Sequence, residues 1–470
     1  MSGVWSRALT GLCASLAGAG LAMAHSQAAA DTLEWALVQA YQNNPSLNAQ
    51  RASLRATDET VPQALSGYRP KISITGTSSY NYYAETSELV LPTGVAITQF
   101  GQNYLTNSVG MTGTYTLFNG FQTANRTRQA ESQVEGARET LRVTEQQVLL
   151  DAATAYMNLL RDQAILDLNR RHVEVLVEQL RQTRQRYQIG ELTRTDVSQA
   201  ESRLAIARFG YLSAQASYAT SQANYRRVIG IDPGKLAPGS PIDRLSPPTL
   251  GQAITQGQEN SPSVLAAMYG VNAAELAVKI SEGQLYPNLS ITATALQGNN
   301  PSFEVLKQTS GSVIGQLAIP IYQGGAEYSA IRQSKETVGQ QRLSLDVNRD
   351  QARATVVQSW AQRESARSQI DAATAAVNAA EVALNGVRQE ARVGQRTTLD
   401  VLNAEQELVN ARTDLVIAQH DRVVASYTLL AAVGGLSMQR LGLNVTIYDP
   451  MVHYQQVRDA WIGVRTPDGR

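Results

Sequence analysis

The chain of 470 residues carries 40 basic and 40 acidic side chains, so its formal net charge is zero. A balanced charge gives no electrostatic reason to expect nucleic acid or an anionic surface as a partner. Only five phenylalanines are present, whereas alanine, glutamine and asparagine are frequent. This composition favours long, thin helical packing over a thick globular core.

The first thirty residues have the pattern of an export signal. Arg7 supplies a positive charge, residues 8–22 are small and apolar, and cleavage after Ala24 or Ala30 would suit signal peptidase. The alternative is a buried helix, which the extreme N-terminal position disfavours. Because the only cysteine, Cys13, lies in this segment, the mature chain would contain no disulfide and no thiolate metal site.

Downstream of residue 30 we find no uninterrupted apolar run of eighteen residues, so a helical inner-membrane protein is not expected. Export without such a helix leaves three destinations. These are the periplasm, the medium, and the outer membrane through a β-barrel.

The rest of the chain contains one unit twice. TLEWALVQAYQNNPS at residues 32–46 matches TLGQAITQGQENSPS at residues 249–263, which start 217 residues later. From Phe118 onwards the two copies pair at a spacing of 204 instead, so a 13-residue change falls between Thr75 and Phe118. The predicted units are a first repeat at 31–230, a linker at 231–248, a second repeat at 249–434 and a tail at 435–470 that belongs to neither repeat.

Each repeat contains a predicted β-hairpin, at residues 70–117 and 287–320. Apolar residues such as Ile72 and Ile74 alternate with Ser73 and Thr75 over about ten residues per strand, which is typical of outer-membrane strands although a soluble sheet has the same pattern. Polar loops are expected to connect the strands, at Ala84 to Asn107 and Gln297 to Ser310.

Four strands cannot close a barrel, and each unpaired backbone group in lipid costs several kcal/mol. Several copies of the chain would therefore have to share one barrel. Three copies supply twelve strands, whereas two copies supply eight, which is too narrow for a transport pore.

Long helical hairpins are predicted at residues 119–230 and 323–434. Between Gly120 and Gly190 there is no proline and one glycine, Gly136, which allows a helix of about 100 Å. Gly190 and Gly394 fit the position just after a helix. An apolar seam runs in steps of seven with one step of four, which relaxes left-handed supercoiling and lets helices stand side by side. An isolated coiled-coil dimer is the alternative. The seam residues are Leu141, Val148, Ala155, Leu159, Leu166, Val173, Leu180 and Tyr187, with Leu345, Ala352, Ile370, Val377, Leu384 and Ala391 in the second copy.

No catalytic constellation is expected. The histidines His25, His172, His420 and His453 are isolated in sequence, and a lone histidine on a long helix is more often a solvated surface residue. The sequence has no GxxxxGK phosphate-binding loop, so energy would have to come from a partner. We therefore expect neither an enzyme nor a cofactor.

The duplicated order of helix, hairpin and helical hairpin resembles the TolC family of outer-membrane efflux and type I secretion proteins. The junctions Leu117–Gly120 and Ile321–Gly324 and the GxxTxxDV tips carry the resemblance, which covers nearly the whole mature chain. It implies an α+β membrane protein: a homotrimer whose twelve-stranded outer-membrane β-barrel, with four strands per chain, continues into a periplasmic α-helical coiled-coil barrel. The implied partners are outer-membrane lipid, a periplasmic adaptor and an inner-membrane ABC or RND-type transporter. The implied function is a passive exit duct for small molecules or unfolded protein.

The resemblance also assigns the two hairpin tips to the periplasmic mouth of the duct. Asp196, with Thr195, stands where family members link across to an arginine, which Arg396 matches, and Asp400 stands at a ring aspartate expected to bind cations. Ala391 replaces a linking tyrosine and Asn403 a second ring aspartate, which implies a weaker gate and a mouth less attractive to cations. Adaptor contacts are expected at Gly190, Leu192, Thr193, Gly394 and Thr397.

Three alternatives remain at this point. Thr193-x-x-Asp196 and Thr397-x-x-Asp400 also have the pattern of a helix N-cap, which requires no gate. A trimeric outer-membrane adhesin or a soluble coiled-coil scaffold would also use long helices. In an adhesin, however, the strands should lie together at the C-terminus rather than mid-chain in two pairs.

Overall fold

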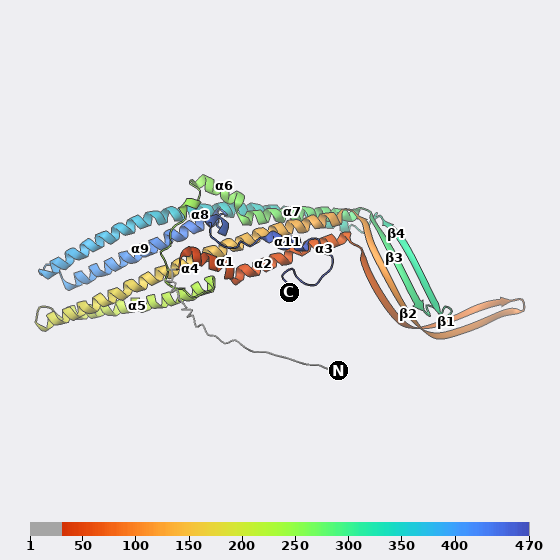
Figure 1. Ribbon diagram of the computed structural model, residues 1–470, viewed down its shortest axis with the longest axis horizontal. Helices are drawn as coiled ribbons and strands as arrows, with labels where there is room; N and C mark the ends of the chain where they lie inside the picture. Colours follow the sequence, from red (N-terminus) through yellow and green to blue (C-terminus); the bar gives the residue numbers. More distant parts are fainter. Residues whose placement is uncertain (1–30, 470) are drawn as a thin grey trace, which may run out of the picture.

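The computed structural model describes residues 31–469. The predicted signal segment, with Cys13 and both cleavage positions, lies outside the described residues. The described chain is elongated, with long helices towards one end and a β-sheet at the other (Figure 1). The predicted α+β fold, with four strands per chain and two copies of one unit, is confirmed.

The first repeat begins with short helices that pack on a long one. α1 (Leu33–Asn43) and α2 (Pro45–Asp58) are followed by α3 (Thr60–Leu65) and the 3-10 turn η1 (Ser66–Tyr68), and all three helices contact α4 (Gln122–Gln188). Thr32 caps α1 by accepting a hydrogen bond from the backbone N–H of Trp35, and Asn44 caps α2 in the same way. The two caps mark where α1 and α2 begin, at the sequence motifs TL (residues 32–33) and NPS (residues 44–46).

Two helical hairpins form the shaft of the molecule. α4 returns through α5 (Arg194–Ile229), and α8 (Ala326–Arg392) returns through α9 (Thr398–Ala432). α4 and α8 have 67 residues each, which corresponds to about 100 Å of helix. Most of the predicted seam is buried or half-buried, although Tyr187 is exposed.

The largest core lies where the short helices meet the middle of the shaft. Tyr156, Tyr225 and Tyr427 are almost fully buried there, together with leucines of α1, α4 and α9. The Tyr156 hydroxyl lies 2.7 Å from the Asp31 carbonyl and 2.6 Å from the Ala237 carbonyl. The hydroxyl has one proton, which the two carbonyls share. This contact fastens the start of the first repeat and the linker to α4.

The second repeat contains a helical stretch that is more apolar than expected. Leu250–Leu285 comprises α6 (Leu250–Asn260), α7 (Pro262–Glu282) and η3 (Gly283–Leu285), and an 18-residue window within it has a mean hydropathy of 1.2. By length and composition alone it could cross a membrane. However, α7 lies along α4 and α8, and Glu275 pairs with Arg342 of α8 at 2.7 Å. α7 therefore packs on the shaft along one side, while only 22% of the apolar window is buried within the single chain.

The four strands form one antiparallel sheet in the order β1 (Lys71–Leu91), β2 (Gly94–Asn119), β3 (Asn288–Asn299) and β4 (Lys307–Ala318). The predicted loop from Ala84 to Asn107 is wrong. The β1–β2 pairing continues without a break to Leu91 and Gly94, so most of that segment is strand. Proline followed by threonine makes the turn, and Gly94 has a φ of 139°, which disfavours other residues.

The longer first hairpin explains the 13-residue change of spacing. The second hairpin ends with Asn299 opposite Lys307, and the equivalent pair in the first hairpin is Tyr82 and Asn103. Twenty residues lie between the latter pair and seven between the former. The extra residues therefore extend the β1–β2 arm beyond β3 and β4, as Figure 1 shows.

The linker and the tail both return to the shaft. The linker contains the turn η2 (Asp243–Leu245), whose Asp243 forms an ion pair with Arg422 of α9. The tail contains α10 (Met438–Leu441) and α11 (Pro450–Val457), and α11 packs on α2. The tail thus joins the two repeats although it belongs to neither.

Candidate functional site

The α4–α5 tip is an exposed helix-to-helix turn with a reciprocal cap. Gly190 has a φ of 84° and its N–H donates to the Tyr187 carbonyl at 3.0 Å. Thr193 caps α5. The Asp196 carboxylate accepts hydrogen bonds from the Thr193 N–H at 2.9 Å and hydroxyl at 2.7 Å. The bond from the Thr193 hydroxyl, followed by that from its backbone N–H, lowers the pKa of Asp196.

The α8–α9 tip repeats this geometry. Gly394 has a φ of 80°, and Asp400 accepts from the Thr397 N–H at 3.0 Å and hydroxyl at 2.9 Å. The backbone bond from Thr397 is the main reason that the pKa of Asp400 is lowered. Arg396 donates to Glu390 of the same hairpin at 2.8 Å, and this bond raises the arginine pKa. Both aspartates are therefore the third-position partners of capping boxes, in which Thr193 and Thr397 are the N-caps.

The structure does not bring the predicted gate pair together within one chain. Among residues 31–469 no ion pair joins Asp196 to Arg396, since each is bonded within its own hairpin. Thr195 and Arg396 are exposed, and Leu192 is half-buried. Both tips nevertheless lie at the same end of the molecule, opposite the sheet (Figure 1).

A different polar contact links the two hairpins near the tips. Arg203 of α5 donates to the Asn403 side-chain oxygen of α9 at 2.7 Å. Beside it Leu402, 1% exposed, packs among the leucines of α4 and α5. From the sequence, Asn403 was expected only as the replacement of a ring aspartate, and Arg203 was not expected at the site. The spacing of seven residues from Asp196 to Arg203 was the available signal, because it places both residues on one face of α5.

A charged groove of about 680 Å³ lies beside this contact, between α4 and the α8–α9 hairpin. It is lined by arginines and glutamates of both hairpins, with few apolar side chains. In its wall Arg388 forms an ion pair with Glu405 of α9, which is largely buried. The lining arginines and glutamates are Arg171, Arg186, Arg388, Arg392, Glu174 and Glu178.

The two faces of the sheet have different chemistry. On one face, apolar side chains of β1 and β2 are largely exposed, with Ile74 at 72%. On the other face hydroxyl groups pair across strands, as Thr77 does with Ser108 and Thr294 with Ser312, both at 2.6 Å. The alternation predicted from the sequence is therefore present in space.

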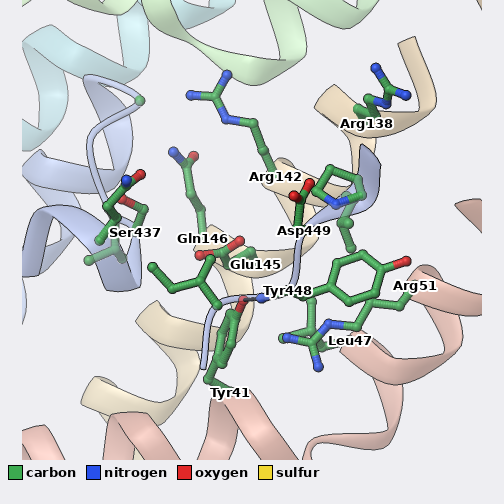
Figure 2. Close-up of a pocket in the computed structure, with 16 residues that line it drawn as sticks. Tyr41, Leu47, Arg51, Arg138, Arg142, Glu145, Gln146, Ser437, Tyr448 and Asp449 are labelled. Atoms are coloured by element: carbon green, nitrogen blue, oxygen red, sulfur yellow. Dashed lines mark hydrogen bonds between the residues drawn. The ribbon is translucent and has the colours of Figure 1, made fainter. Parts of the chain in front are cut away.

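A second cavity, of about 450 Å³, lies between the first repeat and the tail (Figure 2). Arg51 stacks between Tyr41 at 4.5 Å and Tyr448 at 5.2 Å from the ring centroids. Glu145 lies near Arg51 and Arg142 (Figure 2), and burial raises the pKa of Glu145. No sequence motif marks these residues, and within the described chain the contact between Arg51 and Tyr448 joins the tail to α2.

The expectation that the histidines are solvated is wrong for the three that the structure describes. His172, His420 and His453 are all less than 10% exposed. Burial lowers the pKa of His172 and of His420. Nδ1 of His453 lies 2.9 Å from Oδ2 of the fully buried Asp58. The histidines are buried because neighbouring helices pack over them. The residue pattern within one helix does not show where another helix will pack. No cluster of three metal-ligating acids, histidines or cysteines occurs among residues 31–469.

Comparison with known proteins identifies the family. The sequence model described as "Outer membrane efflux protein" matches residues 36–231 and 253–435. The chain is 41% identical over 444 residues to the outer membrane efflux protein BepC of Brucella suis, covering 94% of both chains. It is 25% identical to the outer membrane protein TolC of Escherichia coli, covering 88% of this chain and 85% of TolC. It is also 25% identical to the alkaline protease secretion protein AprF of Pseudomonas aeruginosa, covering 61% of each.

Solved structures show the same fold at low sequence identity. The CmeC outer membrane channel of Campylobacter jejuni superposes with a TM-score of 0.76 at 14% identity, covering 91% of this chain and 89% of CmeC. CusC superposes with a TM-score of 0.73 at 18% identity, covering 86% and 92%. These matches agree with the two-faced sheet and the long helical hairpins. The chain is an outer-membrane efflux and secretion channel protein and belongs to the outer membrane efflux protein family, the TolC family.

Proposed function

We propose that three copies of this chain form the exit duct of a tripartite efflux or type I secretion system. The observation that carries the proposal is the four-stranded sheet, which exposes one apolar face and whose edge strands, β1 and β4, each pair on one side only within residues 31–469. In lipid each unpaired backbone group costs several kcal/mol. Three sheets placed edge to edge supply twelve strands and remove every edge.

The apolar face of the sheet would contact lipid and the hydroxyl face would line the lumen. Such a lumen is polar and conducts without chemistry, which suits small molecules or an unfolded polypeptide. Below the barrel, the helical hairpins would continue the wall across the periplasm. An inner-membrane ABC or RND-type transporter and a periplasmic adaptor would supply the energy. The relative named for alkaline protease secretion supports export of polypeptide, and the relative named for efflux supports a role in efflux.

The hairpin tips would form the periplasmic mouth. Asp196 and Thr195 of one subunit would link to Arg396 of the next, since Arg396 is exposed and its bond to Glu390 is a weak surface contact. Three copies of Asp400 would form a ring that attracts cations. The adaptor would contact the turns at Gly190 and Gly394, with Leu192, Thr193 and Thr397.

The test is the assembly and conductance of the purified full-length protein in detergent and in planar bilayers. We expect a trimer by native mass spectrometry and discrete single-channel currents. A stably monomeric protein that still conducts ions would contradict the proposal. An adhesin is not favoured, because the strands lie at residues 71–119 and 288–318 rather than together at the C-terminus.

A further inference from the structure

The tail contains a short apolar segment that the rest of the described chain leaves uncovered. After α11 the chain runs Trp461-Ile462-Gly463-Val464, which we call the tail segment. Trp461 is 69% exposed, Ile462 96% and Val464 100%. Single apolar side chains on a surface are ordinary, whereas a contiguous exposed group of them indicates a contact surface.

The tail segment is held at the base of the sheet, where the shaft joins the strands. Nη1 of Arg69 donates to the Ala460 carbonyl at 2.7 Å, and Cζ of Arg69 lies 4.6 Å from the centroid of the Trp461 ring. Arg69 comes two residues before Lys71, the first residue of β1. In Figure 1 the chain after α11 forms a loop beside α3, the helix that precedes β1. Trp461 is therefore fixed at the end of the sheet nearest the shaft.

Exposed aromatic residues mark this end of the sheet on all four strands. Each lies within four residues of its strand, with Tyr68 before β1, Phe121 after β2, Tyr286 before β3 and Tyr322 after β4. Outer-membrane sheets carry aromatic girdles at the level of the lipid headgroups, where the rings are partly in lipid and partly in water. Trp461 lies at the same level as this girdle, although it comes from the tail.

Basic side chains lie on both sides of the tail segment. Arg458 precedes it and Arg465 follows it, and Lys71 begins β1 nearby. Asp459 is the only acidic residue between the two arginines. Basic side chains bury their apolar stems and keep their charged ends at phosphate groups, so an apolar core with basic flanks fits a phospholipid surface.

We propose that Trp461, Ile462 and Val464 insert into the periplasmic leaflet of the outer membrane beside the sheet, with phospholipid as their binding partner. This inference rests on the proposed function, because it requires the sheet to cross that membrane. The apolar side chains enter the boundary between headgroups and acyl chains, and the flanking arginines contact phosphates. The tail thereby ties α11, and the helices on which it packs, to the membrane surface. The polar lumen and a second copy of the chain are the other places where the segment could lie.

Trp461 is itself the probe, in full-length protein reconstituted into vesicles of phosphatidylethanolamine and phosphatidylglycerol. Because the chain contains four tryptophans, Trp5→Phe, Trp35→Phe and Trp360→Phe leave only Trp461. A matched control retains only Trp360, which lies about 50 Å along α8 from the start of that helix. Lipids brominated on the upper acyl chain should lower the Trp461 emission about twofold or more, since the ring lies in the boundary region. They should leave the Trp360 emission unchanged.

The other outcomes are separated by a second quencher and by the state of the channel. Adding Ile462→Ser and Val464→Ser should reduce the quenching of Trp461 by brominated lipid. In a conducting channel, Trp461 that only aqueous acrylamide quenches lies in water or in the lumen, which overturns the inference. Trp461 that neither reagent quenches is covered by protein, which overturns it as well. Protein that neither floats with the vesicles nor conducts refutes the proposed function, and this inference with it.

Discussion

Replacing His453 with alanine should loosen the C-terminal tail from α2. Asp58 is fully buried, its Oδ2 lies 2.9 Å from Nδ1 of His453, and its Oδ1 has no hydrogen-bond partner among the described residues. Truncation of the histidine removes the side-chain partner of a buried carboxyl group. The expected penalty is about 2–3 kcal/mol, between that of an orphaned neutral group and that of a broken buried ion pair. This corresponds to a local opening equilibrium about 30- to 150-fold more favourable.

The penalty should depend on pH. Burial raises the pKa of Asp58 above its ordinary 3.8, whereas the hydrogen bond and charge of His453 lower it. Without the histidine the pKa of Asp58 therefore rises further. The folded state then binds the proton more tightly than the unfolded state, so stability is fully present below the ordinary pKa and is lost as the pH rises through the raised one. The variant should be weakest relative to wild type at neutral pH and should recover on acidification.

Hydrogen exchange of α11 measures this effect directly. Backbone amides of residues 451–457 should exchange about 30- to 150-fold faster in His453→Ala at neutral pH. His453→Gln keeps a hydrogen-bond donor and should lose less protection, and adding Asp58→Asn to His453→Ala removes the buried charge and should restore part of it. Unchanged exchange in His453→Ala at neutral pH would refute the reasoning.

Arg396→Ala should raise single-channel conductance by loosening the proposed mouth, and an unaltered conductance would count against a lock at this position. Asp400→Ala should weaken block of the current by multivalent cations. Hydrogen bonds from Thr397 lower the pKa of Asp400 below its ordinary value of 3.8. Block of the wild-type channel should therefore persist as the pH falls to 3.8 and be lost only below that pH. Equal block of the wild-type and Asp400→Ala channels would argue against a cation ring. Ile74→Arg on the apolar face should disfavour membrane assembly by about 2–4 kcal/mol and reduce the heat-resistant oligomer on gels. Thr75→Arg on the hydroxyl face is its control, and equal losses in the two variants would contradict the assignment of faces.

The features that could be predicted from the sequence are those set by periodicity within one element. Seam residues such as Val148 and Leu180 are buried because a seven-residue step fixes one face of a helix wherever the partner lies. The alternation of Ile72 and Ser73 fixed the two sheet faces for the same reason. Glycines at the helix ends, such as Gly190 with its positive φ, were also predictable from chemistry.

The features that were missed depend on partners distant in sequence. His453 was expected in solvent, yet it meets a carboxyl group 395 residues away. Arg203 and Asn403 are 200 residues apart and meet only because α5 and α9 are neighbours near the tips. The segment from Ala84 to Asn107 contains polar and turn-forming residues, and strand pairing overrode that local preference. In each case the deciding interaction lies outside the window in which a sequence pattern is read.

The two hairpins of the sheet pair in equivalent register, with Ile72 opposite Gly113 and Leu289 opposite Leu317. This equivalence bears on the origin of the channel's shape. If every contact between strands obeyed the duplication, a ring of three chains would be built from six equivalent half-chains, and its strand wall would have sixfold rotational symmetry. The twenty-residue arm from Tyr83 to Gln102, compared with seven residues in the second hairpin, and the tail after residue 434 have no counterpart in the other half. Such unmatched segments reduce the symmetry to threefold, and they are the natural places to look for parts that an ancestral half-length subunit lacked.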